Sequence, residues 1–267
     1  MYTGYQSIIG GPDEINVIMG DPDFGSQFAI NEYLIIHNTD DGSTKEMRFD
    51  GAGFAPLRLP PVKTIRAKNS LQRCALDLLN NQAITTVAIL GPAGSGKTFE
   101  AMRMALYLVK DKGAQDKIFG VRNPKGQGVG VGYLPGSLED KTDAFFLPLA
   151  QQLDGGEFEL DRLRQLGTLE ASIPYYLKGL SFNNTIVVAD EAEDFTKEEI
   201  VLIGTRIGQN SRLFMVGDYK QAVGNRTENN PLVLTCSRLR GNPLFGCIYL
   251  DEDVRSETSK MFSTLFD

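Results

Sequence analysis

One eight-residue stretch combines glycines with a lysine and a threonine at a spacing typical of phosphate binding. The stretch is Gly91, Pro92, Ala93, Gly94, Ser95, Gly96, Lys97 and Thr98. Glycines let backbone N–H groups surround phosphate oxygens without a clash with Cβ, and the following helix adds its N-terminal dipole. We expect Lys97 to reach the β- and γ-phosphates of ATP and Thr98 to bind Mg²⁺. The β-branched run 85–90 and the helical pattern 99–110 supply the strand and helix that this motif requires.

Carboxylates and an amide follow two other apolar runs. Asp190 and Glu191 end the run 185–189, and Gln221 lies shortly after the run 213–216. We expect Asp190 to hold Mg²⁺ and Glu191 to polarise an attacking water, which favours hydrolysis over simple phosphate transfer. The neutral amide of Gln221 can sense the γ-phosphate or orient the water.

Four other side chains complete the predicted nucleotide site. Asn69 and Gln72 lie just ahead of the phosphate loop, and the donors and acceptor of Gln72 can read the adenine edge. Arg255 and Arg206 are the candidates for neutralising charge on the γ-phosphate, in the same chain or in a neighbouring subunit. A surface salt bridge is the alternative for each arginine.

Alternating strands and helices must position these residues. Apolar runs predict buried strands at 85–90, 117–121, 185–189, 213–216 and 247–250. Helical spacing follows Asn69 and recurs at 99–110, near 140–152 and at 160–166. This alternation predicts a parallel sheet covered by helices. The long segment between Arg122 and Asn184 is predicted to hold a glycine-rich loop and the last two helices.

The first 60 residues follow a different pattern. They lack helical periodicity, and short apolar runs such as 15–19 and 33–36 lie between glycine-rich or acidic turns. We predict a small β module, followed by a linker that Pro56, Pro60 and Pro61 stiffen. The predicted domains are therefore 1–62 and 63–267.

Composition excludes several classes of function. No apolar run approaches the roughly 20 residues that cross a bilayer, and no signal pattern begins the chain, so we expect a cytoplasmic protein without membrane contact. Cys74, Cys236 and Cys247 are unpatterned and predict buried thiols. His37 is the single histidine, and its polar stretch predicts a surface position. The net charge of −7 argues against nucleic-acid binding by the whole surface. Basic residues cluster at 58–73 and at 110–125. Each cluster has two interpretations, a solvated surface or a local track that binds nucleic acid, and the sequence leaves both open.

Taken together, these motifs resemble the PhoH-like ATPases, relatives of the first RecA-like domain of superfamily 1 helicases. The resemblance runs from about Ile65 to the C-terminus and includes a block at 132–136 that is typical of the family. Residues 28–58 resemble the β module of PhoH proteins that also carry a PIN nuclease, and from the length of 267 residues we expect no such nuclease here. One departure lies after Ala192, where the family favours Gln-Asn and this chain has Glu193 and Asp194.

The resemblance implies an α/β fold with a RecA-like, five-stranded parallel sheet of order 5-1-4-3-2. It implies Mg²⁺-dependent ATP hydrolysis coupled to RNA or single-stranded nucleic acid, with unwinding as one outcome. Because helicases of this kind close the site between two RecA-like domains, we expect a homo-oligomer, such as a hexameric ring. The alternative is a nucleotide-gated regulatory protein with slow hydrolysis. A viral origin, with the host cytoplasm as location, stays equally open.

Overall fold

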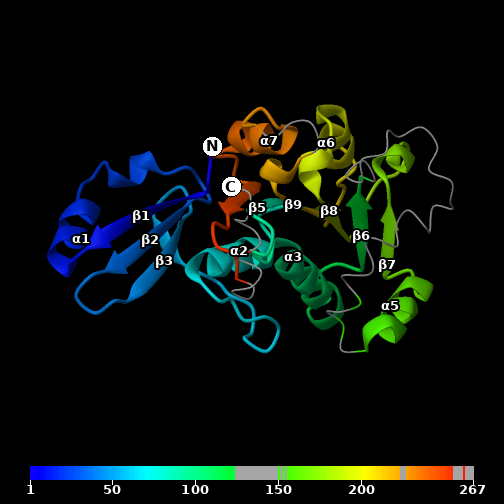
Figure 1. Ribbon diagram of the computed structural model, residues 1–267, viewed down its shortest axis with the longest axis horizontal. Helices are drawn as coiled ribbons and strands as arrows, with labels where there is room; N and C mark the ends of the chain where they lie inside the picture. The colour runs from blue at the N-terminus through cyan, green and yellow to red at the C-terminus, as the bar shows by residue number, and fades with distance from the viewer. Residues whose placement is uncertain (124–149, 151–152, 154, 223–226, 255–260, 262–267) are drawn as a thin grey trace.

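The computed structural model describes residues 1–123, 150, 153, 155–222, 227–254 and 261. Its larger sheet has six parallel strands in the order β10-β5-β9-β8-β6-β7 (Figure 1). The strands are β5 (Thr86–Leu90), β6 (Lys117–Arg122), β7 (Leu169–Ser172), β8 (Thr185–Asp190), β9 (Arg212–Gly217) and β10 (Phe245–Tyr249). From β10 to β6 this is the predicted order 5-1-4-3-2, so the RecA-like fold class is confirmed.

The predicted strand number is wrong by one. β7 lies inside the segment that the sequence analysis assigned to a glycine-rich loop and helices. It is four residues long and pairs with β6 from Leu169 to Ser172. A run this short carries too little periodicity to predict a strand. It is strand because β6 offers it an unpaired edge, which is a tertiary effect.

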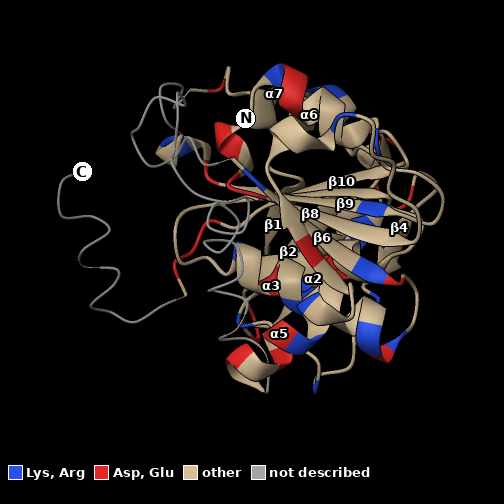
Figure 2. Ribbon diagram, turned by 90° about the vertical axis from the view of Figure 1, so that its right-hand side faces the viewer, with Lys and Arg blue, Asp and Glu red and all other residues tan. Residues whose placement is uncertain are grey.

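Helices cover both faces of this sheet (Figures 1 and 2). One face carries α2 (Ser70–Asn80), α3 (Lys97–Leu106) and α5 (Gly156–Gln165), and the other carries α6 (Lys197–Gly204) and α7 (Pro231–Leu239). Side chains along β5 alternate between the two layers, since Val87 and Ile89 join the first core and Ala88 and Leu90 the second. Burial on both sides explains the uninterrupted apolar strands that the sequence displays.

Most predicted helices lie where the pattern placed them. The helix after Asn69 is α2, and the predicted helix 160–166 is the later part of α5. The predicted helix 99–110 begins two residues earlier, at Lys97, and ends in a π-helical turn, η2 (Tyr107–Asp111). The predicted helix near 140–152 falls largely outside the described residues.

A four-stranded sheet confirms the small N-terminal β module. It has the order β1-β2-β3-β4, with β1 (Tyr5–Gly10) parallel to β2 (Tyr33–Asn38), and with β3 (Thr44–Phe49) and β4 (Phe54–Pro56) antiparallel to their neighbours. His37 lies half-buried on β2, with Nδ1 3.2 Å from Thr44 Oγ1.

The prediction that the first 60 residues contain no helix is wrong. The run 15–19 belongs to α1 (Pro12–Met19), and a 3₁₀ turn, η1 (Phe24–Gln27), follows it. Parallel strands cannot be joined by a tight hairpin, so the chain between β1 and β2 must cross over, and a helix satisfies its backbone groups there. Pro12 at the first helical position begins this helix. Eight residues are too few for a clear sequence period.

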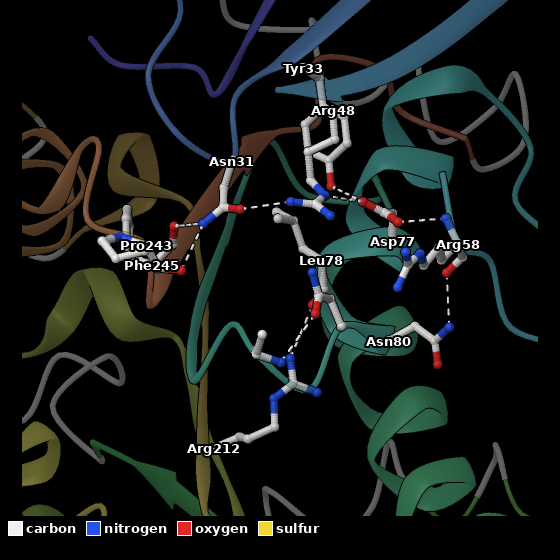
Figure 3. A network of polar contacts seen from close by, with 12 residues as sticks. Asn31, Tyr33, Arg48, Arg58, Asp77, Leu78, Asn80, Arg212, Pro243 and Phe245 are labelled. Atoms are coloured by element: carbon white, nitrogen blue, oxygen red, sulfur yellow. Dashed lines mark hydrogen bonds and ion pairs between the residues drawn. The ribbon is translucent and has the colours of Figure 1, made fainter. Parts of the chain in front are cut away.

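A buried carboxylate joins the β module to the helical layer (Figure 3). Asp77 on α2 accepts hydrogen bonds from the Tyr33 hydroxyl at 2.7 Å, from Arg48 Nε at 3.0 Å and from the Arg58 backbone N–H at 2.6 Å. The Asp77 residue is 1% exposed. Each oxygen is therefore satisfied by a group from β2, β3 or the linker after β4, and the two units share one polar network.

We expect Asp77→Ala to lower the free energy of unfolding by about 3–5 kcal/mol, because it leaves the Arg48 guanidinium and the Tyr33 hydroxyl buried without their partner. Urea unfolding followed by circular dichroism measures the change. Glu170→Ala is the control, since its ion pair with Lys117 is 3.5 Å long and both side chains are more than 40% exposed. The control should change stability by less than about 1 kcal/mol. An equal effect of both substitutions would contradict the assignment.

Cys74, Cys236 and Cys247 are buried and unpaired, as predicted. Within the described part of the chain, no helix combines the length and the apolar character that crossing a bilayer requires.

Candidate nucleotide site

The phosphate loop joins the end of β5 to the start of α3. Its backbone turns at Gly91, Gly94 and Gly96, which have φ of +152°, +83° and +94°. A Cβ on Gly91 would lie 2.2 Å from the Leu250 carbonyl oxygen, so this position has room only for glycine. The loop therefore forms an open cradle at the N-terminus of a ten-residue helix, where anions bind favourably.

Lys97 holds the cradle together in this structure. Its Nζ donates to the carbonyl oxygens of Gly91 and Pro92 at 2.7 and 2.8 Å. Burial lowers the pKa of the Lys97 ammonium, and nearby carboxylates, Asp218 first among them, oppose this change. A phosphate entering the cradle would thus meet a partly desolvated ammonium. To bind the phosphate, Lys97 would only have to replace its two hydrogen bonds to carbonyl oxygens with hydrogen bonds to phosphate oxygens.

Thr98 and Asp190 meet beside the cradle. The Thr98 hydroxyl donates to Asp190 Oδ1 at 3.0 Å, although the two residues come from α3 and from the end of β8. Burial raises the pKa of the Asp190 carboxyl, and Arg122 opposes this with an ion pair from Nη1 to Oδ2 at 3.3 Å. A hydroxyl and a carboxylate are the hard oxygen donors that Mg²⁺ prefers, and this ion commonly takes few protein ligands. The pair fits that ion.

Glu191 follows Asp190 in a left-handed conformation, with φ of +50°, which is unusual for a residue other than glycine. This turn separates the two acids: the Asp190 side chain is 7% exposed, whereas that of Glu191 is 42% exposed. Arg122 Nη2 reaches Glu191 Oε1 at 3.2 Å. One carboxylate is thus placed to hold an ion, and the other is open to water.

Arg122 is a member of this site that the sequence analysis did not include in it, since it counted Arg122 only within the basic stretch 110–125. It ends β6 and is in register with Asp190 on the neighbouring strand β8. The predicted strand order contained this information, since adjacent parallel strands end at the same edge of a sheet. Of the basic stretch 110–125, residues 124 and 125 lie outside the described residues.

Glu193 is a further buried acid that no prediction named. The residue is 4% exposed, and its Oε2 is 2.3 Å from the position that a Cβ on Gly217 would occupy. Burial, followed by the neighbouring Glu191, raises the pKa of the Glu193 carboxyl to about 9. At neutral pH the side chain is therefore uncharged, like the glutamine that the family favours at this position.

We expect Glu193→Gln to stabilise the protein at pH 8 and to change it little at pH 5. An unfolded glutamate titrates near pH 4.5, so between that pH and about 9 the folded state binds more protons and the free energy of unfolding falls as pH rises. Glutamine removes this proton uptake, which corresponds to about 5 kcal/mol of added stability at pH 8 and to less than about 1 kcal/mol at pH 5. Urea unfolding at the two pH values measures it. Glu198→Gln, at an exposed position, should change neither value, and equal gains for Glu193→Gln at both pH values would contradict the prediction.

Gln221 lies at the same edge of the sheet. It ends the 3₁₀ turn η6 (Tyr219–Gln221) after β9, and its Nε2 donates to Asp218 Oδ2 at 2.6 Å. Asp218 is 4% exposed and also accepts from the Lys220 N–H. The hydrogen bond to Asp218 holds the Gln221 amide in place. Because Gln221 is exposed, the rest of this amide remains open to solvent.

Gln72 and Asn69 are engaged with the backbone of the site. Gln72 Nε2 donates to the Ser95 carbonyl at 3.0 Å, and its Oε1 accepts from the Lys68 N–H at 2.7 Å. Asn69 caps α2 by accepting from the Gln72 N–H, and its Nδ2 donates to Glu252 at 3.0 Å. In this structure Gln72 therefore connects the linker to the phosphate loop.

The two predicted arginines differ in what the structure describes of them. Arg255 lies outside the described residues. Arg206 follows α6, and its carbonyl accepts a hydrogen bond from the N–H of Phe182, which precedes β8. Residues before β8 lie at the amino edge of the parallel sheet, opposite the phosphate loop. Arg206 therefore cannot reach the cradle of its own chain.

A cavity of about 450 Å³ opens beside the cradle, a size suited to a nucleotide. It is lined by Ile65, Arg66, Lys68, Gln72, Gly94, Gly96, Lys97, Thr98, Phe99, Glu100 and Val254.

Comparison with known proteins agrees with this geometry. The family model described as PhoH-like protein matches residues 64–267. The chain belongs to the PhoH family. PhoH2 of Bacillus subtilis is 31% identical over 287 residues, covering 99% of this chain and 64% of that protein. The PhoH-like protein of Mycobacterium tuberculosis H37Rv is 35% identical over 161 residues, covering 60% and 45%. The PhoH-like protein of B. subtilis is 30% identical over 192 residues, covering 71% and 59%.

This PhoH-family chain thus spans between 45% and 64% of the length of these relatives. Among solved structures, the Hef helicase domain of Pyrococcus furiosus is 16% identical and covers 66% of this chain, with a TM-score of 0.39. A similarity this low carries no functional argument. Family membership, the phosphate loop and the sheet order together identify a P-loop NTPase.

Proposed function

We propose that this PhoH-family protein binds ATP with Mg²⁺ and hydrolyses it. The observation that carries the proposal is the meeting of Thr98, Asp190 and Glu191 beside the Lys97 cradle at one edge of the sheet. Lys97 and the loop N–H groups would hold the phosphates, and Thr98 and Asp190 would hold the ion. Bound Mg²⁺ would neutralise charge on the β- and γ-phosphates.

The remaining side chains have roles that follow from their placement. Glu191, exposed and beside a buried acid, would accept a proton from the attacking water. Gln221, held by Asp218, would orient that water or sense the γ-phosphate. Arg122 would offset the repulsion between Asp190 and Glu191 when no ion is bound, because it forms an ion pair with each.

We further propose that hydrolysis is coupled to RNA or single-stranded nucleic acid. The 3₁₀ turn η4 (Pro174–Leu177) follows β7 at the same edge of the sheet as the phosphate loop. It presents Tyr175 and Tyr176, which are 71% and 49% exposed, and Lys178 Nζ lies 6.0 Å from the Tyr175 ring centroid. Exposed aromatic rings beside a cation are suited to stacking on unpaired bases.

The test is the ATPase rate with and without single-stranded RNA, on protein whose oligomer size is known. Stimulation by RNA supports coupling, and the affinity should fall with salt by roughly 0.7 in log units per log unit of salt for each phosphate neutralised. Slow hydrolysis without stimulation, and no binding to single strands at low salt with an ATP analogue, would favour the nucleotide-gated regulatory protein instead.

A shared active site is the third part of the proposal. Each RecA-like domain leaves one side of its ATP open, and a ring-like homo-oligomer would close it with an arginine from a neighbour. Arg206 suits this role because it lies at the edge of the sheet opposite its own cradle and because its Nε is buried with no partner in the described part of the chain.

Mixing two inactive variants tests this arrangement. Lys97→Ala protein lacks a working cradle, and Arg206→Ala protein would lack the neighbour's cation. We expect mixed oligomers to regain part of the ATPase activity, at interfaces that combine an intact cradle with an intact arginine. No recovery in verified mixed oligomers, or full activity of a monomer, would rule out the shared site.

A further inference from the structure

A buried carboxyl in the nucleotide cavity has no role in the phosphate chemistry. Glu100 lies in the first turn of α3 and is 2% exposed. Its Oε2 is buried and has no hydrogen-bond partner among residues 1–123, 150, 153, 155–222, 227–254 and 261. Leaving a buried polar group unsatisfied costs about 1–3 kcal/mol. Leucine at this position would avoid that cost, so the carboxyl has a use only if something else supplies its partner.

The position of Glu100 points to the nucleoside end of a bound nucleotide. It lies two positions after Thr98, which corresponds to about 200° around the helix, so it faces away from the ion-binding side. It lines the same cavity as Lys97 and the phosphate loop, and the linker residues Ile65 and Arg66 form another wall. A triphosphate in the cradle would place its sugar and base in this part of the cavity.

The other walls suit a flat aromatic base. Phe99, which is 47% exposed, Ile65 and Val254 supply apolar surface. Gln72 already uses both ends of its amide on backbone groups: Oε1 accepts from the Lys68 N–H, and Nε2 donates one hydrogen to the Ser95 carbonyl. Among the described residues that line this cavity, Glu100 is therefore the side chain with a buried acceptor that has no partner. Burial raises the pKa of its carboxyl, and the neutral form still keeps an acceptor oxygen.

We propose that the Glu100 carboxyl accepts a hydrogen bond from the exocyclic amine of adenine and so makes the cavity selective for adenine nucleotides. This inference rests on the proposed ATP binding and adds the residue that distinguishes the base. A ligand without the amine would leave the buried acceptor unsatisfied, just as it is in the protein alone.

Calorimetric titration with ATP and with purine riboside triphosphate, which lacks only the amine, tests the proposal. The wild-type protein should bind ATP about tenfold more tightly, since one such bond is worth roughly 1.4 kcal/mol. Glu100→Leu should bind both ligands with equal affinity, because the acceptor is gone. Glu100→Gln keeps an acceptor and should keep the preference. Glu198→Leu, at an exposed first-turn glutamate of α6, is the matched control and should keep it too.

The outcomes separate this inference from the proposed function. If Glu100 were only structural, Glu100→Leu would weaken both ligands by the same factor, and an unchanged tenfold ratio in that variant would overturn the inference. Equal binding of the two ligands to the wild type would overturn it as well, while ATP binding itself stood. Binding of neither ligand to the wild type would overturn ATP binding and the inference together.

Discussion

Replacing Lys97 with alanine is expected to lower the ATPase rate at least about 100-fold, the effect of removing one preorganised donor from a charged transition state. The Lys97 Nζ donates to two loop carbonyls at 2.7 and 2.8 Å, and several acidic side chains act on its charge, Asp218 most strongly. Without the ammonium, those acids would also repel the phosphates. ATP affinity should therefore fall together with the rate.

The measurement is phosphate release at saturating ATP, with nucleotide binding followed by titration. Lys197→Ala is a suitable control, because Lys197 is an exposed lysine at the first position of α6, which also follows a strand of the same sheet. The control should retain wild-type activity. Near-normal hydrolysis by purified, folded Lys97→Ala protein would be incompatible with the phosphate-loop assignment.

The second large effect is expected from Glu191→Gln, which should lower the rate by about 10²–10⁴ while ATP affinity stays within a few-fold of wild type. Glutamine keeps the shape of the side chain at this left-handed position but cannot accept a proton from water. The exposed ion pair with Arg122 is also lost, and this should change stability by less than about 1 kcal/mol.

Asp190→Asn is the informative comparison. Asp190 contacts Thr98 and is buried, so its substitution should raise the Mg²⁺ concentration needed for half-maximal activity. Glu191→Gln should leave that concentration unchanged. The test is an Mg²⁺ titration of ATPase activity for both variants. If Glu191→Gln turns over at the wild-type rate, another group must act as the base.

The departure from the family pattern at Glu193 has a physical explanation. An extra charge beside Asp190 and Glu191 would oppose phosphate binding, and the sequence alone presents Glu193 as such a charge. The side chain is instead enclosed against Gly217, and the Glu193 backbone is held by Asn230, whose Nδ2 donates to the backbone carbonyl oxygen at 2.9 Å. Because its pKa is raised to about 9, it remains neutral where a glutamine would be neutral.

The order of five strands came from the resemblance to the PhoH-like ATPases. The sequence by itself determined the phosphate loop and the alternation of strands and helices. These follow from local rules: glycine at positions without space for Cβ, apolar runs buried on two faces, and a helix cap at Asn69. It also determined that Asp190 and Glu191 end a buried strand. The family assignment agrees with each of these features.

Tertiary structure alone decided the rest. β7 exists because β6 had a free edge, and α1 exists because β1 and β2 are parallel. Arg122 joins the acids because neighbouring strands end together. The neutral state of Glu193 depends on burial, and so does the unpaired carboxyl of Glu100. Burial is produced by residues distant in the chain, so its electrostatic consequences become visible only once the elements have packed.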